Sequence, residues 1–388
     1  MKRDYEYIVV GLGGFGSGAA YWLARQAGAE VLGLEQFELG HVRGESQDHS
    51  RIIRLSYHTP GYVELAKHAF AAWREVERDA GESLILRTGG LDLGPADSAI
   101  PLRNYSESMD AAGVEYETLD AGEIMRRWPP FRLTDDIQGL FQPESGIAMA
   151  AKGNATHQRL ALAHGATLRD RSPVESISAH DGELHIRSSG LEYRCRQLII
   201  AAGAWSNTIL DHFDTRLPLT VTQEQVTYFA SPRLADFQPD RFPIWIWMDD
   251  PCFYGFPVFG EPGPKVGQDA GGKEVTAESR TFDTDADALE RVQGFLKRYL
   301  PSALGPILYT KSCLYTLTPD RDFVLDRLPD NPQVLVAIGG GHGFKFASLV
   351  GRILADMACD GDTALNIQPF RIDRPILQQE NPPRNYMV

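Results

Sequence analysis

The chain has 388 residues, of which 43% are hydrophobic and 23% are charged, a balance that excludes disordered and collagen-like chains. Its 52 acidic residues outnumber its 38 basic residues. The resulting formal net charge of −14 disfavours nucleic acid or an anionic membrane as a partner, because both are bound by basic faces. At roughly 150 residues per domain, the length predicts about two domains.

The cysteines and the apolar segments indicate the cellular setting. Four cysteines, at positions 195, 252, 313 and 359, are too few and too scattered to predict a disulfide framework or a zinc site. No apolar stretch reaches the ~18 residues that a membrane-spanning helix needs, and the first residues lack the apolar segment of a signal peptide. We therefore expect a cytoplasmic protein that binds no metal and no membrane.

The first 35 residues predict a strand, a glycine-rich loop, a helix and a second strand. Residues 7–10 form a short apolar strand, residues 17–26 are helix-forming, and residues 30–35 are the second strand. The loop residues Gly11, Gly13, Gly14, Phe15 and Gly16 match the dinucleotide-binding pattern G-x-G-x-x-G. The first glycine allows a tight turn, the second lets a pyrophosphate approach, and the third lets the helix pack on the strand. The phosphates would then lie at the helix N-terminus.

The acidic residue at the end of the second strand indicates which nucleotide can bind. Glu35 ends the second strand, where a carboxylate would accept hydrogen bonds from the ribose hydroxyls. An acid here disfavours a 2′-phosphate, so we do not expect NADP. The glycine loop and Glu35 are compatible with both FAD and NAD.

The rest of the chain alternates helical and β-rich stretches, without an internal repeat or a low-complexity linker. Residues 62–80 predict an amphipathic helix with Leu65, Ala66, Phe70 and Trp73 on one face. Helices are also expected over 153–164, about 285–299 and about 344–358, mixed short elements over 85–145, and β-rich stretches over 174–202 and 219–313. Asp181-Gly182 is a hairpin signal, and the strand 334–338 leads into a second glycine-rich turn, 339–343. The pattern favours two domains with interleaved segments.

Four later motifs resemble those of one flavoprotein family. They are Ser50-Arg51-Ile52-Ile53-Arg54, the strand and turn 198–205, Ser312-Cys313-Leu314-Tyr315-Thr316, and the glycine-rich turn 339–345. With the first glycine loop they resemble the sarcosine oxidase family of FAD-dependent amine oxidases, which includes monomeric sarcosine oxidase and N-methyltryptophan oxidase. The motifs follow in family order at family spacing, and the resemblance spans about residues 5–376.

The resemblance implies an α/β (α+β) fold of two domains, a Rossmann-like FAD-binding domain and a β-sheet domain that caps the substrate. We expect residues 1–84, 146–218 and 314–388 in the FAD-binding domain, and residues 85–145 and 219–313 in the substrate domain. This division agrees with the interleaved pattern of elements.

The resemblance also implies the cofactor, FAD bound covalently through Cys313 to the flavin 8α-methyl group. The other three cysteines match no family position, and we expect them to be structural. The remaining residues expected to contact the cofactor are Gly11, Gly13, Gly14, Phe15, Gly16, Glu35, Gln36, Ser46, Ser50, Arg51, Val174, Ala202, Gly203, Trp205, Gly341, His342, Gly343, Phe344 and Lys345.

The resemblance also implies roles for four charged side chains. Arg51 would lie against the flavin ring, and Arg54 would bind the substrate carboxylate, to which its planar fork is suited. Lys345 lies at a helix start, where a cation needs an anion nearby, either the substrate carboxylate or negative charge at the flavin pyrimidine edge. The resemblance implies the carboxylate. Lys265 would activate O2, because a fixed cation stabilises superoxide-like charge.

Aromatic side chains supply further candidates. Tyr254 matches an active-site tyrosine of the family. Trp245 and Trp247 share one face of a strand, so they either form an aromatic wall against the substrate or pack within the sheet. Both interpretations stay open, and we take the two tryptophans as candidate substrate contacts.

The sequence departs from the family pattern at three places. Lys265-Val266-Gly267-Gln268-Asp269 has a carboxylate where the family commonly has a histidine. We expect Asp269 to lie near the substrate amine and to change the amine preference. The turn 339–342 is one residue shorter than usual, and 44–48 replaces a Ser/His-rich stretch, so sarcosine itself is not the expected best substrate.

The expected function is oxidation of a secondary or N-substituted α-amino acid to an imine, with O2 reduced to H2O2. The partners would be a small amine or amino acid and O2, and we expect a monomer. The alternatives are a flavin oxidase or dehydrogenase of a cyclic imino acid (pipecolate or proline type) or a glycated amino acid, and a non-catalytic flavin-binding module. An NAD-dependent dehydrogenase would explain only the first 36 residues.

Overall fold

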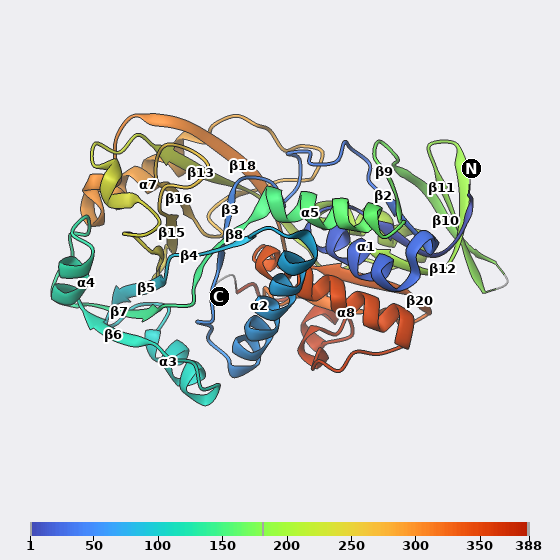
Figure 1. Ribbon diagram of the computed structural model, residues 1–388, viewed down its shortest axis with the longest axis horizontal. Helices are drawn as coiled ribbons and strands as arrows, with labels where there is room; N and C mark the ends of the chain where they lie inside the picture. Colours follow the sequence, from blue (N-terminus) through green and yellow to red (C-terminus); the bar gives the residue numbers. More distant parts are fainter. Residues whose placement is uncertain (1, 181, 386–388) are drawn as a thin grey trace.

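The structure is a computed structural model that describes residues 2–180 and 182–385. Its strands form two large sheets and one small sheet. Figure 1 shows the first large sheet with its helices on one side of the molecule and most of the second large sheet on the other. The expected combination of a Rossmann-like part with a β-sheet part is confirmed.

The first large sheet contains the dinucleotide-binding pattern. Its strand order is β10-β11-β12-β1-β2-β9, with β20 beside β12 and β19 beside β20. Its strands are β1 (Asp4–Val10), β2 (Val31–Leu34), β9 (Thr167–Arg169), β10 (Val174–His180), β11 (Glu183–Ser188), β12 (Leu191–Ile200), β19 (Val324–Leu328) and β20 (Asn331–Ile338). β1 pairs in parallel with both β2 and β12, as a βαβ unit requires. The hairpin signal is bracketed by β10 and β11, which pair antiparallel, while Asp181 lies outside the described residues.

Helices cover this sheet. α1 (Gly14–Ala27) packs against α5 (Ala150–Ala163) and α8 (Ala347–Asp360). A Cβ on Gly351 would lie 2.3 Å from the Gly18 carbonyl carbon, so only glycine permits this close approach of α8 to α1. The apolar faces of these helices belong to the largest core cluster.

The predicted amphipathic helix is α2 (Pro60–Ala80), which begins two residues earlier than expected. Thr59 accepts a hydrogen bond from the Tyr62 N–H as the N-cap, Pro60 occupies the first turn, and Gly81 ends the helix at φ +68°. The four residues predicted for its apolar face are all buried.

The second large sheet has the order β17-β13-β16-β15-β14-β5-β7-β6, with β18 beside β13. Its strands are β5 (Gly90–Pro95), β6 (Glu117–Asp120), β7 (Ile137–Gln142), β13 (Thr220–Phe229), β14 (Ile244–Trp247), β15 (Phe253–Phe256), β16 (Lys265–Gln268), β17 (Lys273–Glu274) and β18 (Ile307–Leu317). Together with α7 (Ala286–Tyr299), this sheet encloses a separate aromatic core. α3 (Leu102–Ala111) and α4 (Ala121–Arg127) lie between β5 and β7 in the chain.

The two large sheets alternate along the chain, as the interleaved pattern predicted. The small sheet forms where the chain passes between the two large sheets. Its strands are β3 (Ser50–Ile53), β8 (Gly146–Met149) and β4 (Ile85–Arg87). The domain boundary expected between residues 313 and 314 falls inside β18, which pairs along its length with β13. No helix in the described ranges is long and apolar enough to cross a membrane.

Candidate active site

One cavity is lined by residues from both large sheets and from the loops between them. The glycine loop and Glu35 line one part of it, and the turn 339–345 and strands β15, β16 and β18 contribute to its wall. Every residue expected to contact the cofactor lines this cavity except Gly16 and Ser50. Segments far apart in the sequence therefore meet at one site.

The glycine loop has the conformation that its motif predicts. Gly11 has a φ of +88°, which favours glycine. A Cβ on Gly16 would lie 1.8 Å from the Gly11 carbonyl oxygen, so Gly16 acts by letting α1 begin close to β1. The Gly14 N–H donates to Ser46 Oγ at 2.7 Å, which fixes the 44–48 segment over the start of α1. The loop and the helix N-terminus together fit a pyrophosphate.

Glu35 presents an ionised carboxylate to the cavity. Its Oε2 accepts a hydrogen bond from the Leu12 N–H at 2.8 Å, and its Oε1 accepts one from the Phe37 N–H at 3.1 Å. Burial opposes ionisation, but contacts with His41 and with these two N–H groups outweigh it and hold the pKa of Glu35 below its usual value. An ionised carboxylate here can accept hydrogen bonds from ribose hydroxyls, and that role of Glu35 stays a prediction.

Two unsatisfied polar atoms support a ligand in this cavity. Arg54 Nε and His342 Nδ1 are buried and have no hydrogen-bond partner in the described part of the chain. Both residues line the cavity. Buried polar atoms are normally paired, so these atoms indicate partners supplied by a bound molecule. Together with the glycine loop and Glu35, the residues present fit FAD.

Arg51 and Arg54 both face the cavity, although they lie three residues apart. This is possible because β3 ends at Ile53 and Arg54 lies just beyond it. The Arg51 guanidinium donates to the carbonyls of Ser50 and Glu45, at 2.8 and 2.7 Å. Arg54 is paired with a carboxylate on β5 that the sequence analysis did not identify, Asp92, whose Oδ1 lies 3.2 Å from Nη1.

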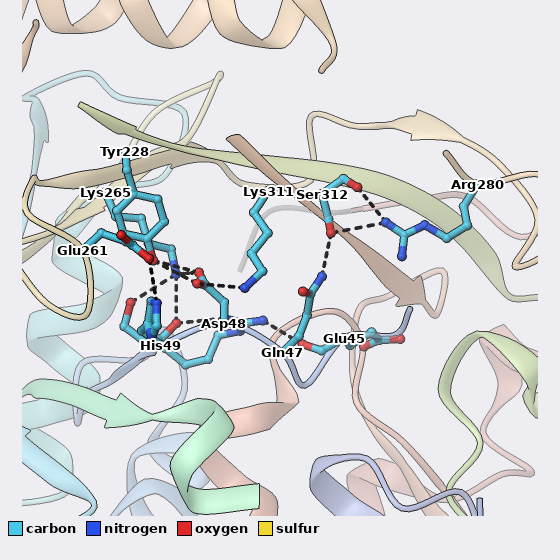
Figure 2. Close-up of polar contacts among 12 residues, drawn as sticks. Glu45, Gln47, Asp48, His49, Tyr228, Glu261, Lys265, Arg280, Lys311 and Ser312 are labelled. Atoms are coloured by element: carbon cyan, nitrogen blue, oxygen red, sulfur yellow. Dashed lines mark hydrogen bonds and ion pairs between the residues drawn. The ribbon is translucent and has the colours of Figure 1, made fainter. Parts of the chain in front are cut away.

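Lys265 lies on β16 and is only 2% exposed. Its Nζ lies 2.6 Å from Asp48 Oδ2 and donates to Ser50 O at 3.0 Å and Ser50 Oγ at 3.1 Å. Ser50, expected to contact the cofactor, therefore holds Lys265 and does not line the cavity. Figure 2 shows Asp48, Tyr228, Lys265 and Lys311 converging on one point.

Asp269 lines the cavity, but its charge is already paired. Arg321 donates to both of its oxygens, at 2.6 and 2.8 Å, and the Arg321 side chain is 1% exposed. Burial opposes ionisation of Asp269, but Arg321 holds its pKa below the usual value. The carboxylate expected near the substrate amine is therefore present in the cavity, but a buried arginine neutralises it, and its effect on the amine preference stays a prediction.

Lys345 lines the cavity from the 3₁₀ turn before α8. Burial, and then the nearby Arg54, lower its pKa to about 7, while Asp269 opposes this shift. Lys345 forms no ion pair with a carboxylate of the described chain, in contrast to Arg54 and Arg321. When it is protonated, it can therefore accept an anionic ligand.

Only one of the three aromatic candidates lines the cavity. Tyr254 on β15 lines the cavity. Trp245 and Trp247 do not, since they are 1% and 4% exposed and their rings lie 5.4 Å from that of Phe295 on α7. Their expected contact with substrate is wrong, because α7 covers their face of β14 and turns it into core.

Cys313 lies on β18, lines the cavity and is a free thiol. Burial raises the pKa of this thiol to about 11, and Arg51 opposes the shift. The position suits a bond to a ring in the cavity. The other three cysteines do not line the cavity.

Three charged residues of the site were missed by the sequence analysis: Asp48, Asp92 and Arg321. Each is an ion-pair partner of a predicted residue far away in sequence. No local pattern distinguishes them from surface charges. Only Asp48 had a signal, because it lies in the stretch 44–48 that departs from the family.

The fold and the site together define a flavin-dependent oxidoreductase. Residues 6–357 match the family model described as DAO, FAD dependent oxidoreductase, and the chain belongs to this family. This match confirms FAD over NAD, and the NAD-dependent dehydrogenase is not retained.

Known proteins resemble the chain over nearly its whole length. A monomeric sarcosine oxidase from Streptomyces avermitilis is 36% identical, with 95% of this chain and 97% of that protein covered. An N-methyl-L-tryptophan oxidase from Salmonella heidelberg is 32% identical, with 95% and 99% covered. The solved structure of NikD, described as an unusual amino acid oxidase essential for nikkomycin biosynthesis, is 27% identical with a TM-score of 0.85, and 95% and 98% of the two chains are covered. The family resemblance expected from the motifs is confirmed.

Proposed function

We propose that this oxidoreductase acts on a secondary or N-substituted α-amino acid. The substrate loses two electrons and two protons from its CH–NH group to give an imine, and O2 takes them up to give H2O2. The names of the two curated relatives support this class, since one is an oxidase of sarcosine and the other of N-methyl-L-tryptophan. When bound, FAD supplies the hydride acceptor.

The observation that carries the proposal is the charge balance of the cavity. Arg54 is balanced by Asp92, Arg321 by Asp269, and Lys265 by Asp48. Lys345 lies close enough to Arg54 and Arg321 for both to lower its pKa. When Lys345 is protonated, it therefore adds a positive charge that no carboxylate of the described chain pairs with, and a substrate carboxylate would balance it.

The cavity residues have distinct roles in this reaction. Lys345 and the unpaired Nε of Arg54 hold the substrate carboxylate, and Tyr254 bounds the space beside it. Arg51 supplies positive charge near Cys313 and the reacting ring. Lys265 supplies a fixed cation for the reduction of O2.

The amine must lose its proton before hydride leaves, because a cationic nitrogen cannot stabilise the developing positive charge. Burial in the cavity disfavours the charged form of the amine, so the neutral amine is favoured over its protonated form. The oxygens of Asp269 still have lone pairs, which can accept an N–H of the amine without adding net charge.

Anaerobic bleaching of the visible flavin absorbance tests the proposed function. The purified protein is mixed with sarcosine, N-methyl aromatic amino acids, pipecolate, proline and fructosyl amino acids. We expect an N-methyl amino acid to bleach the flavin fastest and H2O2 to form when air is admitted. A cyclic or glycated substrate that bleaches faster would contradict the substrate class, and no bleaching by any of them would contradict the amino acid oxidase function.

A covalent flavin through Cys313 is a separate prediction. After acid precipitation the yellow colour should stay in the protein pellet, whereas in Cys313→Ser it should move into the supernatant. Cys359→Ser is the matched control, because Cys359 lies on α8 away from the cavity, and its pellet should stay yellow. Colour in the wild-type supernatant would refute the bond.

Three broader expectations stay predictions. They are the division into domains, the monomeric state and the cytoplasmic location. Size-exclusion chromatography with light scattering would test the second directly.

A further inference from the structure

Asp48 is a buried carboxylate surrounded by cations in the wall of the cavity. Its side chain is 3% exposed, and its oxygens lie 2.6 Å from Lys265 Nζ and 3.5 Å from Lys311 Nζ. The Tyr228 hydroxyl donates to it, with both carboxylate oxygens at 3.0 Å. Arg51 lies close enough to lower its pKa. Figure 2 shows Tyr228, Lys265 and Lys311 around Asp48, with His49 and Glu261 paired beside them.

Without Asp48, these cations would face each other inside the protein. Lys265 would keep only the neutral acceptors of Ser50, and its charge would meet Lys311 and Arg51. Burial without a counter-ion destabilises the charged form of an ammonium group, so its pKa falls and it loses its proton. The carboxylate therefore determines whether Lys265 carries a charge.

We propose that Asp48 is a positioning residue that keeps Lys265 protonated and directed at the cavity at neutral pH, so that Lys265 can promote the reaction of the reduced flavin with O2. The proposal rests on the proposed function, in which Lys265 has this role. It adds a residue outside the recognised motifs, 217 positions away from Lys265 in the sequence.

The charges around Lys265 agree with this role. Burial lowers the pKa of Lys265 to about 8, Asp48 opposes this shift, and Arg51 adds to it. The other titratable or charged groups around the pair are Tyr228, Tyr309, Lys311, Cys313 and, beyond Tyr309, Glu261. An opposite charge within hydrogen-bond distance typically shifts a pKa by about 1–3 units. Losing Asp48 should thus leave Lys265 mostly neutral near pH 8.

The first test measures flavin reoxidation against pH in the holoenzyme. The flavin is reduced with dithionite, so no substrate needs to be known, and is then mixed with O2. We expect the wild-type rate to fall as pH rises through about 8. In Asp48→Asn the fall should move down by about one unit or more, which makes the variant about fivefold slower near pH 8.

Two further variants separate charge from structure. Asp48→Glu keeps the carboxylate and should restore the wild-type profile. Glu261→Gln removes a neighbouring carboxylate that pairs with His49, and should leave the profile unchanged. An Asp48→Asn profile that coincides with the wild type, or a faster rate at every pH, would overturn the proposal.

The second test does not use activity. The melting temperature of Asp48→Asn should lie below that of the wild type, and the gap should narrow as pH rises from about 6 to above 8. The reason is that protonated Lys265 needs the counter-ion and neutral Lys265 does not, so the difference between the two proteins diminishes between their two folded-state pKa values. A gap that is constant with pH would show a merely structural hydrogen bond and would overturn the protonation role.

The two tests also separate this proposal from the proposed function. If O2 fails to reoxidise the reduced wild type, the oxidase function is refuted together with the oxygen step of this proposal. The melting gap then still decides whether Asp48 keeps Lys265 protonated.

Discussion

Replacing Lys265 by methionine is expected to slow the reoxidation of the flavin by O2 by about 100-fold or more, while the reduction of the flavin by substrate stays nearly unchanged. The Lys265 ammonium is buried and held by Asp48 and Ser50, so its charge is fixed before O2 arrives. A preorganised charge stabilises superoxide-like character without reorganisation cost. Methionine has a similar length and no charge, so the cavity stays filled.

Rapid mixing measures the two half-reactions separately. Lys311→Met is the matched control, because Lys311 also faces Asp48 but at 3.5 Å and with a quarter of its side chain exposed. We expect its effect on reoxidation to be several times smaller. If Lys265→Met slows reduction and reoxidation equally, the lysine has a general structural role and no specific oxygen role.

The parts of the site that were predictable are those whose chemistry is local. The glycine loop, Glu35 and α1 lie within one βαβ unit, so strand, turn and helix signals locate them together. Cys313 and Lys345 were identified by the motifs around them, and both line the cavity. In these cases the sequence signal that identifies the residue lies next to it in the chain.

The ion-pair partners could not be predicted, because they are joined only by the fold. Arg321 meets Asp269 across 52 residues, and Arg54 meets Asp92 across 38. A local sequence motif does not indicate which of its charges are neutralised by residues far away in the chain. The free charge of Lys345 therefore became visible only once the pairs around it were known.

The tryptophans show a second limit. The period of two correctly predicts that Trp245 and Trp247 share a face of β14, whereas Ile246 between them belongs to a different core cluster. Which face meets the cavity depends on α7, a helix about forty residues further along the chain. Periodicity supplies the two faces of a strand, and only packing assigns them.

Binding of a simple carboxylate, such as acetate, is expected to weaken as pH rises above about 7, by up to about tenfold per pH unit. Lys345 holds an anion best when protonated, and burial beside Arg54 lowers its pKa in the free protein to about 7. The bound anion stabilises the ammonium, so binding takes up a proton above that pH. Acetate has no amine, which removes the opposing requirement for an unprotonated substrate nitrogen.

Perturbation of the flavin spectrum by the bound anion gives the dissociation constant at each pH. Lys345→Met should weaken binding near pH 6 by about 30-fold or more, because one charged partner of a desolvated pair is lost. The same change should also flatten the pH profile, leaving only the weak attraction of Arg54, whose charge Asp92 already balances. Lys311→Met removes a cation beside Asp48, and its affinity for acetate should match the wild type. An affinity that does not change between about pH 6 and 9, or that survives the loss of Lys345, would mean that the carboxylate is held elsewhere.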